Sequence, residues 1–286
     1  MNFMETSFQI NIFVNYNILN YKKLKTNNNK PLILVTNDDG INSPGIKTLI
    51  EMARKFGDVI AIAPDEGRSG MSHAITIKYP LRINKVRDED NFVLYSCSGY
   101  PADCVKLGIN QILDRKPDLL LSGINHGSNS SISVVYSGTM AAAIEGGLHG
   151  IPSIGLSITD YSSRPDFATS IFYGEIIIKN TLINGLPDGV CLNVNFPKVY
   201  SDDIKGIKIC RQARGVWIEE FDKRSDPHRR EYFWLTGYFK NYESDAEDTD
   251  EWALKNKYVS VVPVRTDFSE INAMSKLKTE YAKASI

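Results

Sequence analysis

Residues 33–40 read ILVTNDDG, an apolar run that ends abruptly in two adjacent carboxylates, Asp38 and Asp39, and a glycine. Ser43 and Pro44 follow, a pair typical of the start of a helix. The stretch therefore predicts a buried strand whose carboxyl end opens into a loop, which is where open α/β sheets bind ligands. Two neighbouring acids are costly unless a positive charge neutralises them. A divalent metal ion is the economical explanation, and an Asx turn with helix capping is the structural alternative.

The composition is that of an ordinary globular protein: 286 residues, 42% hydrophobic and 23% charged, with a formal net charge of −1. Nothing in this balance suggests a polyanion-binding surface, so we expect no duplex nucleic acid as a partner. No apolar run approaches the ~18 residues that span a bilayer, and the N-terminus is a poor signal peptide. We therefore expect a cytoplasmic protein with no membrane partner. The four cysteines contain no C-x-x-C pair, which favours buried free thiols over a zinc site or disulfides.

Strand and helix patterns alternate along residues 31–196. Strands are expected at 32–36, 59–63, 73–77, 92–96, 119–121, 153–158 and 192–194, and helices at 44–57, 101–113, 139–148 and 166–182. This alternation is typical of an α/β fold, a Rossmann-like and mostly parallel sheet with helices on both faces. We predict that residues 31–196 form the α/β catalytic core.

The pattern changes at both ends of the chain. Short β segments are expected at 207–210, 229–235 and 258–264, around an acidic loop at 243–251, with a terminal helix at 269–283. Residues 197–286 are therefore predicted to be a β-rich appendage and a C-terminal segment used in oligomerisation. Residues 1–30 are rich in asparagine and are predicted to be a disordered extension or an over-long translation start.

Three further loops carry oxygen donors or anion-binding groups. Ser69 could offer a hydroxyl to a metal or a phosphate, and Asn125 an amide oxygen. Ser137, Gly138 and Thr139 open directly into a helix, whose free N–H groups would bind an anion. Taken singly, these segments also fit a flexible surface loop or ordinary helix capping. Because each follows a strand on the same expected rim of the sheet, we expect the topology to bring them together.

Two histidines lie in these loops, and three common motifs are absent. His73 would suit protonation of a leaving group, or a simple hydrogen bond at a strand start. His126 is isolated, which favours a structural role over metal ligation. The chain has no G-x-G-x-x-G, no G-x-x-x-x-G-K-[ST] and no G-x-S-x-G. A dehydrogenase, a P-loop NTPase and an esterase with a nucleophile elbow are therefore disfavoured.

The chain resembles the SurE family, the stationary-phase survival proteins, which are metal-dependent 5′/3′-nucleotidases. The resemblance covers residues 31–268 and is carried by ILVTNDDGINSPGI, APDEGRSGMSHAIT, GYPADCVKLGIN, PDLLLSGINHGSN, VVYSGTMAAAIEG and IPSIGLSI, then REYFWLTG and YVSVVPVRTDFS. Residues 1–30 have no counterpart in the family. The loop at 65–68 departs from the Arg-rich or Asn-rich family pattern, and His73 occupies a position that varies between His and Asn.

The resemblance implies roles for particular residues. The metal ligands would be Asp38, Asp39, Ser69 and Asn125, and the phosphate-binding region would contain Asn129, Ser137, Gly138 and Thr139. It also implies a homodimer or homotetramer that exchanges C-terminal segments.

The hypothesis is hydrolysis of nucleoside monophosphates to nucleoside and phosphate, with one divalent ion per subunit, Mg²⁺ or Mn²⁺. Asp38 and Asp39 would be the catalytic residues, either as metal ligands alone or with one of them orienting, deprotonating or replacing the attacking water. Two alternatives stay open: a metal phosphoesterase that acts mainly on short polyphosphate, and a nucleotide-sensing module without turnover.

Overall fold

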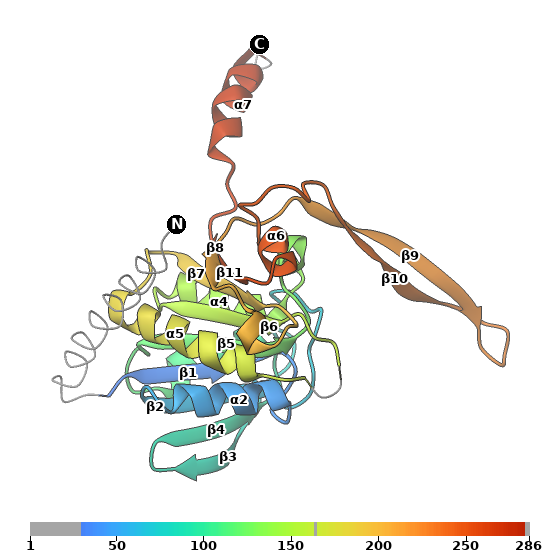
Figure 1. The fold of residues 1–286 in the computed structure, drawn as a ribbon. Helices are drawn as coiled ribbons and strands as arrows, with labels where there is room; N and C mark the ends of the chain where they lie inside the picture. Colours follow the sequence, from blue (N-terminus) through green and yellow to red (C-terminus); the bar gives the residue numbers. More distant parts are fainter. Residues whose placement is uncertain (1–29, 163–164, 284–286) are drawn as a thin grey trace.

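One sheet of nine strands organises the chain in this computed structural model, which describes residues 30–162 and 165–283 (Figure 1). The strands are β1 (Leu32–Thr36), β2 (Asp58–Pro64), β3 (Ile83–Glu89), β4 (Phe92–Cys97), β5 (Leu119–His126), β6 (Ser153–Ile158), β7 (Val190–Phe196), β8 (Ile207–Ile209) and β11 (Val259–Arg265). Their order is β3-β4-β2-β1-β5-β6-β7-β11-β8. Strands β4, β2, β1, β5, β6 and β7 run parallel, whereas β3 and β11 pair antiparallel with β4 and β7. The predicted α/β fold with a mostly parallel sheet is confirmed.

Helices cover both faces of this sheet (Figure 1). They are α2 (Pro44–Ala53), α3 (Pro101–Leu107), α4 (Gly138–Leu148) and α5 (Ala168–Asn184). Successive side chains of β1 point to opposite faces. Val35 packs in the core beneath α2 and α5 with Leu49, whereas Leu34 packs in a second core with Cys104 and Ala142 of α3 and α4. The alternation of β1 therefore joins two separate apolar layers.

Helix α2 begins where the sequence predicts and ends a turn earlier. The Ser43 hydroxyl accepts a hydrogen bond from the Ile46 backbone N–H at 3.4 Å, and Pro44 fills the first helical position. The helix ends at Ala53 and not at Gly57. Gly57 has a different purpose, because a Cβ there would lie 2.1 Å from the Pro31 carbonyl oxygen.

Two other predicted boundaries need correction. Residues 73–77 form no strand; the Thr76 N–H and hydroxyl are instead bonded to the Asp103 carboxylate. The strand expected at 119–121 continues to His126, because Asn125 and His126 pair with β6 after an irregularity at Ser122. Asn125 therefore lies at the end of a strand and not in a loop.

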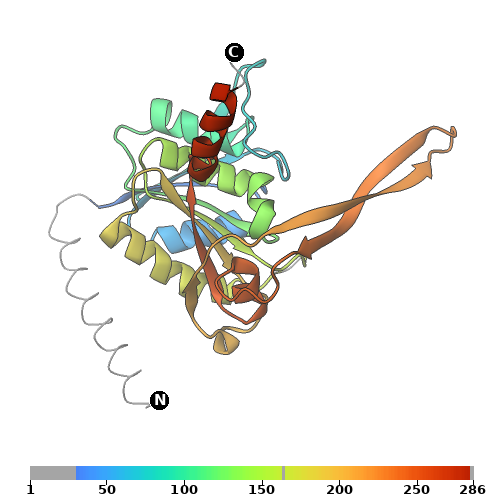
Figure 2. The same ribbon diagram turned by 90° about the horizontal axis from the view of Figure 1, so that it is seen from above.

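The C-terminal part both completes the sheet and extends away from it. Strands β8 and β11 belong to the main sheet, so the boundary predicted after residue 196 falls inside that sheet. Strands β9 (Gly215–Ser225) and β10 (Glu231–Asn241) pair with each other as a long hairpin that projects from the body, as does helix α7 (Ile271–Lys283) (Figures 1 and 2). Short helices complete the chain: α6 (Asp250–Lys255), η1 (Gly108–Ile112), η2 (Ser131–Val135) and η3 (Ser201–Asp203). The π-helical η1 extends α3 over most of the helix predicted at 101–113.

Three remaining expectations concern the cysteines, the membrane and the N-terminus. All four cysteines are free and buried, as predicted. Among the described residues, no helix is both long enough and apolar enough to cross a membrane. The predicted N-terminal extension lies outside the described residues, except for Lys30.

Candidate functional site

The turn after β1 holds the two aspartates at the carboxyl edge of the sheet. The Asn37 amide donates to the Gly40 carbonyl and to the Ser43 hydroxyl, both at 2.9 Å. Gly40 adopts φ +89°, and a Cβ there would lie 3.0 Å from the Glu66 carbonyl carbon. This turn leaves Asp38 only 3% exposed. The local sequence thus fixes where the acid pair lies.

Asp38 lies against the N-terminus of α4. The Thr139 hydroxyl donates to Asp38 Oδ1 at 2.5 Å. A Cβ on Gly138 would lie 2.8 Å from the Asp38 Cβ, so the helix approaches this closely only because the residue is glycine. The Ser137 hydroxyl accepts from the Met140 N–H at 3.0 Å and caps the helix. All three residues of the predicted anion-binding segment therefore lie at this helix start, and two of them contact Asp38.

Asp39 contacts Ser69 and the backbone at the end of β5, the strand that carries Asn125. The Ser69 hydroxyl lies 3.5 Å from Asp39 Oδ1, and the His126 backbone N–H donates to Asp39 Oδ2 at 3.2 Å. Asn125 precedes His126 on β5, and its amide nitrogen donates to the Gly127 carbonyl at 2.8 Å. That bond leaves the Asn125 amide oxygen as the side-chain atom available to a ligand.

Arg68 is near the acid pair, but its charge is used elsewhere. Its backbone N–H donates to the Asp38 carbonyl at 2.7 Å. Its guanidinium lies 3.0 Å from Glu66 and 3.6 Å from Asp65, and 5.4 Å from the centre of the Tyr100 ring. The side chain therefore pairs with the acids of its own loop.

Neither Asp38 nor Asp39 forms an ion pair within residues 30–162 and 165–283, although the His126 imidazole favours the ionised form of Asp39 electrostatically. Burial raises the pKa of Asp38 to about 6; the Thr139 hydrogen bond opposes this rise and the Asp39 charge adds to it. Burial also raises the pKa of Asp39, against the hydrogen bond from the His126 backbone. Two partly desolvated carboxylates side by side attract a cation.

The donor set suits a hard divalent ion. Asp38, Asp39, Ser69 and Asn125 offer two carboxylates, a hydroxyl and an amide oxygen, the ligand types that Mg²⁺ and Mn²⁺ prefer. In the described part of the chain, no group of three or more His, Cys, Asp or Glu side chains is arranged so that it could hold a metal ion. The residues present therefore fit an oxygen-ligated ion and not a zinc site of the His and Cys type.

Asn129 lies in a buried amide network. Its side chain donates to the Ser157 hydroxyl, its backbone N–H donates to Asn195, and its carbonyl accepts from Asn193, each at 2.8 Å. These contacts hold the loop after β5, and none of them reaches the acid pair. Asn193 and Asn195 were missed by sequence reasoning, although two amides at alternate positions of an apolar strand point to one face and mark a polar network.

His73 contacts a buried acid that the sequence analysis missed. Its Nε2 lies 2.9 Å from Glu145 of α4, whose side chain is 4% exposed. Lys106 and His149 also pair with Glu145, at 2.6 and 3.2 Å. A lone acid in the run AAAIEGG is the signal that marks such a buried network. His73 therefore joins the Ser69 loop to α4 through a hydrogen bond, although no strand begins there.

The fold and this oxygen-rich edge define an α/β protein whose polar site lies where a parallel sheet meets a helix N-terminus. Residues 33–219 match the family described as Survival protein SurE. The chain belongs to the SurE family. It is 56% identical over 249 residues to the 5′-nucleotidase SurE of Flavobacterium psychrophilum, covering 87% of this chain and 96% of that protein.

Two further comparisons agree with this placement. The 5′-nucleotidase SurE of Christiangramia forsetii is 58% identical over 245 residues, which cover 85% of this chain and 94% of that protein. The crystal structure of the SurE protein from Aquifex aeolicus matches with a TM-score of 0.76 at 38% identity, over 88% of this chain and 100% of that one.

Proposed function

We propose that this chain is a 5′-nucleotidase that hydrolyses nucleoside monophosphates to nucleoside and phosphate with a bound divalent ion. Its relatives at 56% and 58% identity carry the name 5′-nucleotidase SurE, and the chain spans 94% or more of each. The observation that carries the proposal is the buried pair Asp38 and Asp39, neither of which forms an ion pair in the described ranges, with Asp38 packed against the N-terminus of α4. Carboxylates that would bind a cation lie beside a helix N-terminus that would bind an anion, and hydrolysis of a phosphate ester uses both.

Four side chains would hold the ion: Asp38, Asp39, Ser69 and Asn125. One Mg²⁺ or Mn²⁺ per subunit, when bound, supplies Lewis-acid charge to a phosphate oxygen and lowers the pKa of a coordinated water. Thr139 holds the Asp38 carboxylate in one orientation through its hydroxyl.

The first turn of α4 would bind the phosphate. The Met140 N–H donates to the Ser137 hydroxyl and the Thr139 N–H interacts with Asp38, which leaves the Gly138 N–H for the phosphate at the positive end of the helix dipole. Gly138 presents no side chain that would block it. The Thr139 hydroxyl and its backbone N–H both interact with the Asp38 carboxylate, so Thr139 would act by holding that acid beside the phosphate. Asn129 would act by holding the neighbouring loop in place.

The test replaces each acid by its neutral isostere. Asp38→Asn and Asp39→Asn should each lower phosphate release from AMP by at least ~100-fold and abolish calorimetric Mn²⁺ binding, because a ligand charge is lost. Asp65→Asn is the matched control, since Asp65 is an exposed acid of the same rim that pairs with Arg68. Retention of most activity in both variants would overturn the proposal.

The same assay separates the alternatives. AMP, GMP, a 3′-nucleotide and polyphosphate are compared as substrates with Mg²⁺ and with Mn²⁺. A clear preference for polyphosphate would indicate the other phosphoesterase, and stoichiometric AMP binding without phosphate release would indicate a sensing module.

We also propose a homodimer or homotetramer in the cytoplasm. The hairpin β9–β10 and helix α7 project from the body (Figure 2). They expose large apolar side chains, including Phe221, Trp234, Ile271 and Leu277. Exposed apolar surface of this kind marks contact regions. Light scattering after size exclusion should give two or four times 32.1 kDa, and a monomer would contradict the proposal.

A further inference from the structure

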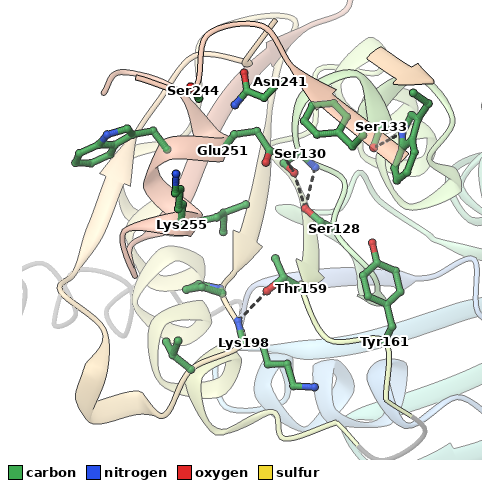
Figure 3. A pocket seen from close by; sticks show the side chains of 16 residues that line it. Ser128, Ser130, Ser133, Thr159, Tyr161, Lys198, Asn241, Ser244, Glu251 and Lys255 are labelled. Carbon is green, nitrogen blue, oxygen red and sulfur yellow. Dashed lines mark hydrogen bonds between the residues drawn. The ribbon is translucent and has the colours of Figure 1, made fainter. Parts of the chain in front are cut away.

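A cavity of about 610 Å³ opens beside the loop that follows β5 (Figure 3). Ser128 and Ser130 line it from that loop, and Glu251 lines it from α6. Trp217 and Phe239, from the base of the β9–β10 hairpin, form an aromatic wall. Its size is within the range of small-molecule sites, which combine apolar walls with a few convergent polar groups.

The cavity lies close to the acid pair. Ser128 is three residues after Asn125, and three extended residues span at most ~10 Å. The Tyr161 ring, which also lines the cavity, packs on the backbone between them: a Cβ on Gly127 would lie 2.6 Å from Tyr161 Cε1. A ligand whose phosphate is at the acid pair can therefore extend into this cavity with the rest of its length.

The walls of the cavity are held before any ligand arrives. Asp250 is fully buried and accepts hydrogen bonds from the Ser131 N–H at 2.8 Å and the Ala213 N–H at 2.9 Å. It thereby joins α6, the loop after β5 and the approach to the hairpin. The Ser130 hydroxyl donates to Glu251 Oε1 at 2.5 Å, and Figure 3 shows the Glu251 side chain directed at Ser130 and Ser128. Binding here requires little ordering of the protein.

We infer that this cavity is the ribonucleoside subsite of the proposed nucleotidase, in which Glu251 accepts the ribose hydroxyls and the base stacks on Trp217 and Phe239. The inference rests on the proposed function. With increasing distance from the acid pair, the cavity is lined by Ser128, then by Ser130 with Glu251, and then by the aromatic wall. This order matches that of phosphate, ribose and base in a nucleotide.

The chemistry of each wall fits the part assigned to it. Glu251 Oε2 accepts no hydrogen bond from any residue in the described ranges, and a carboxylate repels phosphate but accepts from hydroxyls. The Trp217 indole N–H donates to the Ser133 hydroxyl at 3.3 Å, and its ring meets that of Phe239 at 5.8 Å and 62°. A fixed indole that is 39% exposed offers a stacking surface that tolerates any base.

The first test removes the stacking surface and varies the substrate. Trp217→Ala should raise the KM for AMP by about tenfold. It should leave the KM for ribose 5-phosphate, which has no base, unchanged, and Trp217→Phe should restore most of the affinity for AMP. Trp234→Ala is the matched control, because Trp234 is an exposed tryptophan farther along the same hairpin and does not line the cavity. An equal KM for AMP in both alanine variants overturns the inference.

The second test removes the charge of Glu251. Wild-type protein should prefer AMP to 2′-deoxy-AMP, and Glu251→Gln should lower that preference by roughly tenfold, since a hydrogen bond to a charged group is lost. Glu247→Gln is the control, because Glu247 is exposed and outside the cavity lining. An unchanged ratio in Glu251→Gln contradicts the assignment of the ribose.

A binding measurement separates this inference from the proposed function. Adenosine should bind the metal-free wild type in calorimetry, about tenfold more weakly to Trp217→Ala, and normally to Trp234→Ala. No adenosine binding to the wild type, or equal binding to both variants, refutes the subsite. If the proposed function fails instead, the wild type releases no phosphate from AMP or ribose 5-phosphate while the adenosine result stands.

Discussion

Replacing Gly138 by alanine tests whether the close approach of α4 positions the acid pair. The new Cβ would lie 2.8 Å from the Asp38 Cβ and 3.0 Å from Oδ2, whereas ordinary contacts begin at 3.4 Å. Helix α4 and the end of β1 must therefore separate by about 0.6 Å, the difference between the 2.8 Å contact and an ordinary contact of 3.4 Å. The Asp38 Cβ is attached directly to buried backbone, so this displacement cannot be absorbed at the tip of a flexible side chain.

The structural and functional effects have different sizes. Overpacking costs ~1–3 kcal/mol, and alanine in a helix returns ~0.5–1 kcal/mol, so we expect a net loss of about 1–2 kcal/mol in unfolding free energy. Catalytic groups must be held within ~0.5 Å, and a misplacement of ~1 Å costs about 100-fold. Phosphate release from AMP should therefore fall by ~10- to 100-fold, and Mn²⁺ should bind more weakly.

Gly147→Ala is the matched control in the same helix. A Cβ at Gly147 meets its nearest atom, Thr266 Cγ2, at 3.7 Å, so this variant should gain ~0.5–1 kcal/mol and keep full activity. Urea unfolding measures the unfolding free energy, calorimetric titration measures the Mn²⁺ affinity, and a phosphate-release assay measures the activity. Wild-type Mn²⁺ affinity and kcat/KM in Gly138→Ala would refute the reasoning.

Three further predictions concern buried acids. Burial raises the pKa of Asp38 to about 6, so Mn²⁺ affinity should fall about tenfold per pH unit below that value, and a flat titration between about pH 7 and pH 5 would contradict this. Burial opposes ionisation of Glu145, but hydrogen bonds from His73 and Lys106 lower its pKa from 4.5 to about 2. The ionised group therefore adds about 3 kcal/mol to the unfolding free energy above pH 4.5, and this contribution is lost as the pH falls towards 2. The deficit of Glu145→Gln in urea unfolding should therefore be about 1.4 kcal/mol larger at pH 7 than at about pH 3.5, and equal deficits would refute the linkage. Asp250→Ala leaves the Ser131 and Ala213 N–H groups buried without an acceptor and should destabilise the protein by about 2–4 kcal/mol. An unchanged urea midpoint would contradict the stabilising role of these two hydrogen bonds.

Local sequence was sufficient where an element is defined by its own residues. Strands β1 and β6 have the predicted bounds because each is a mostly apolar run that is followed directly by polar residues. Ser43 and Pro44 mark the start of α2 through capping chemistry that involves only near neighbours. The acid pair was found for the same reason: a strand that ends in two carboxylates is a local signal with few structural explanations.

Contacts between distant segments decided the rest. Strand β5 reaches Asn125 because β6 pairs with it, and nothing in residues 122–126 alone shows this. Strand β9 was not predicted because its side chains are exposed on both faces, so no alternating pattern marks it. Glu145 and Asn129 each have a partner far away in the chain: His73 is 72 residues from Glu145, and Ser157 is 28 residues from Asn129.

The burial of Asp38 implies a trade-off between keeping a reactive site and keeping a stable fold. A carboxyl whose pKa rises from 3.8 to about 6 on folding weakens the metal-free protein by about 3 kcal/mol at neutral pH, and this penalty disappears on acidification below the unfolded value. An amide of the same shape avoids the penalty and can still accept the Thr139 hydroxyl. The Asp38→Asn protein should therefore melt at a higher temperature than the metal-free wild type, even though we expect it to release little phosphate.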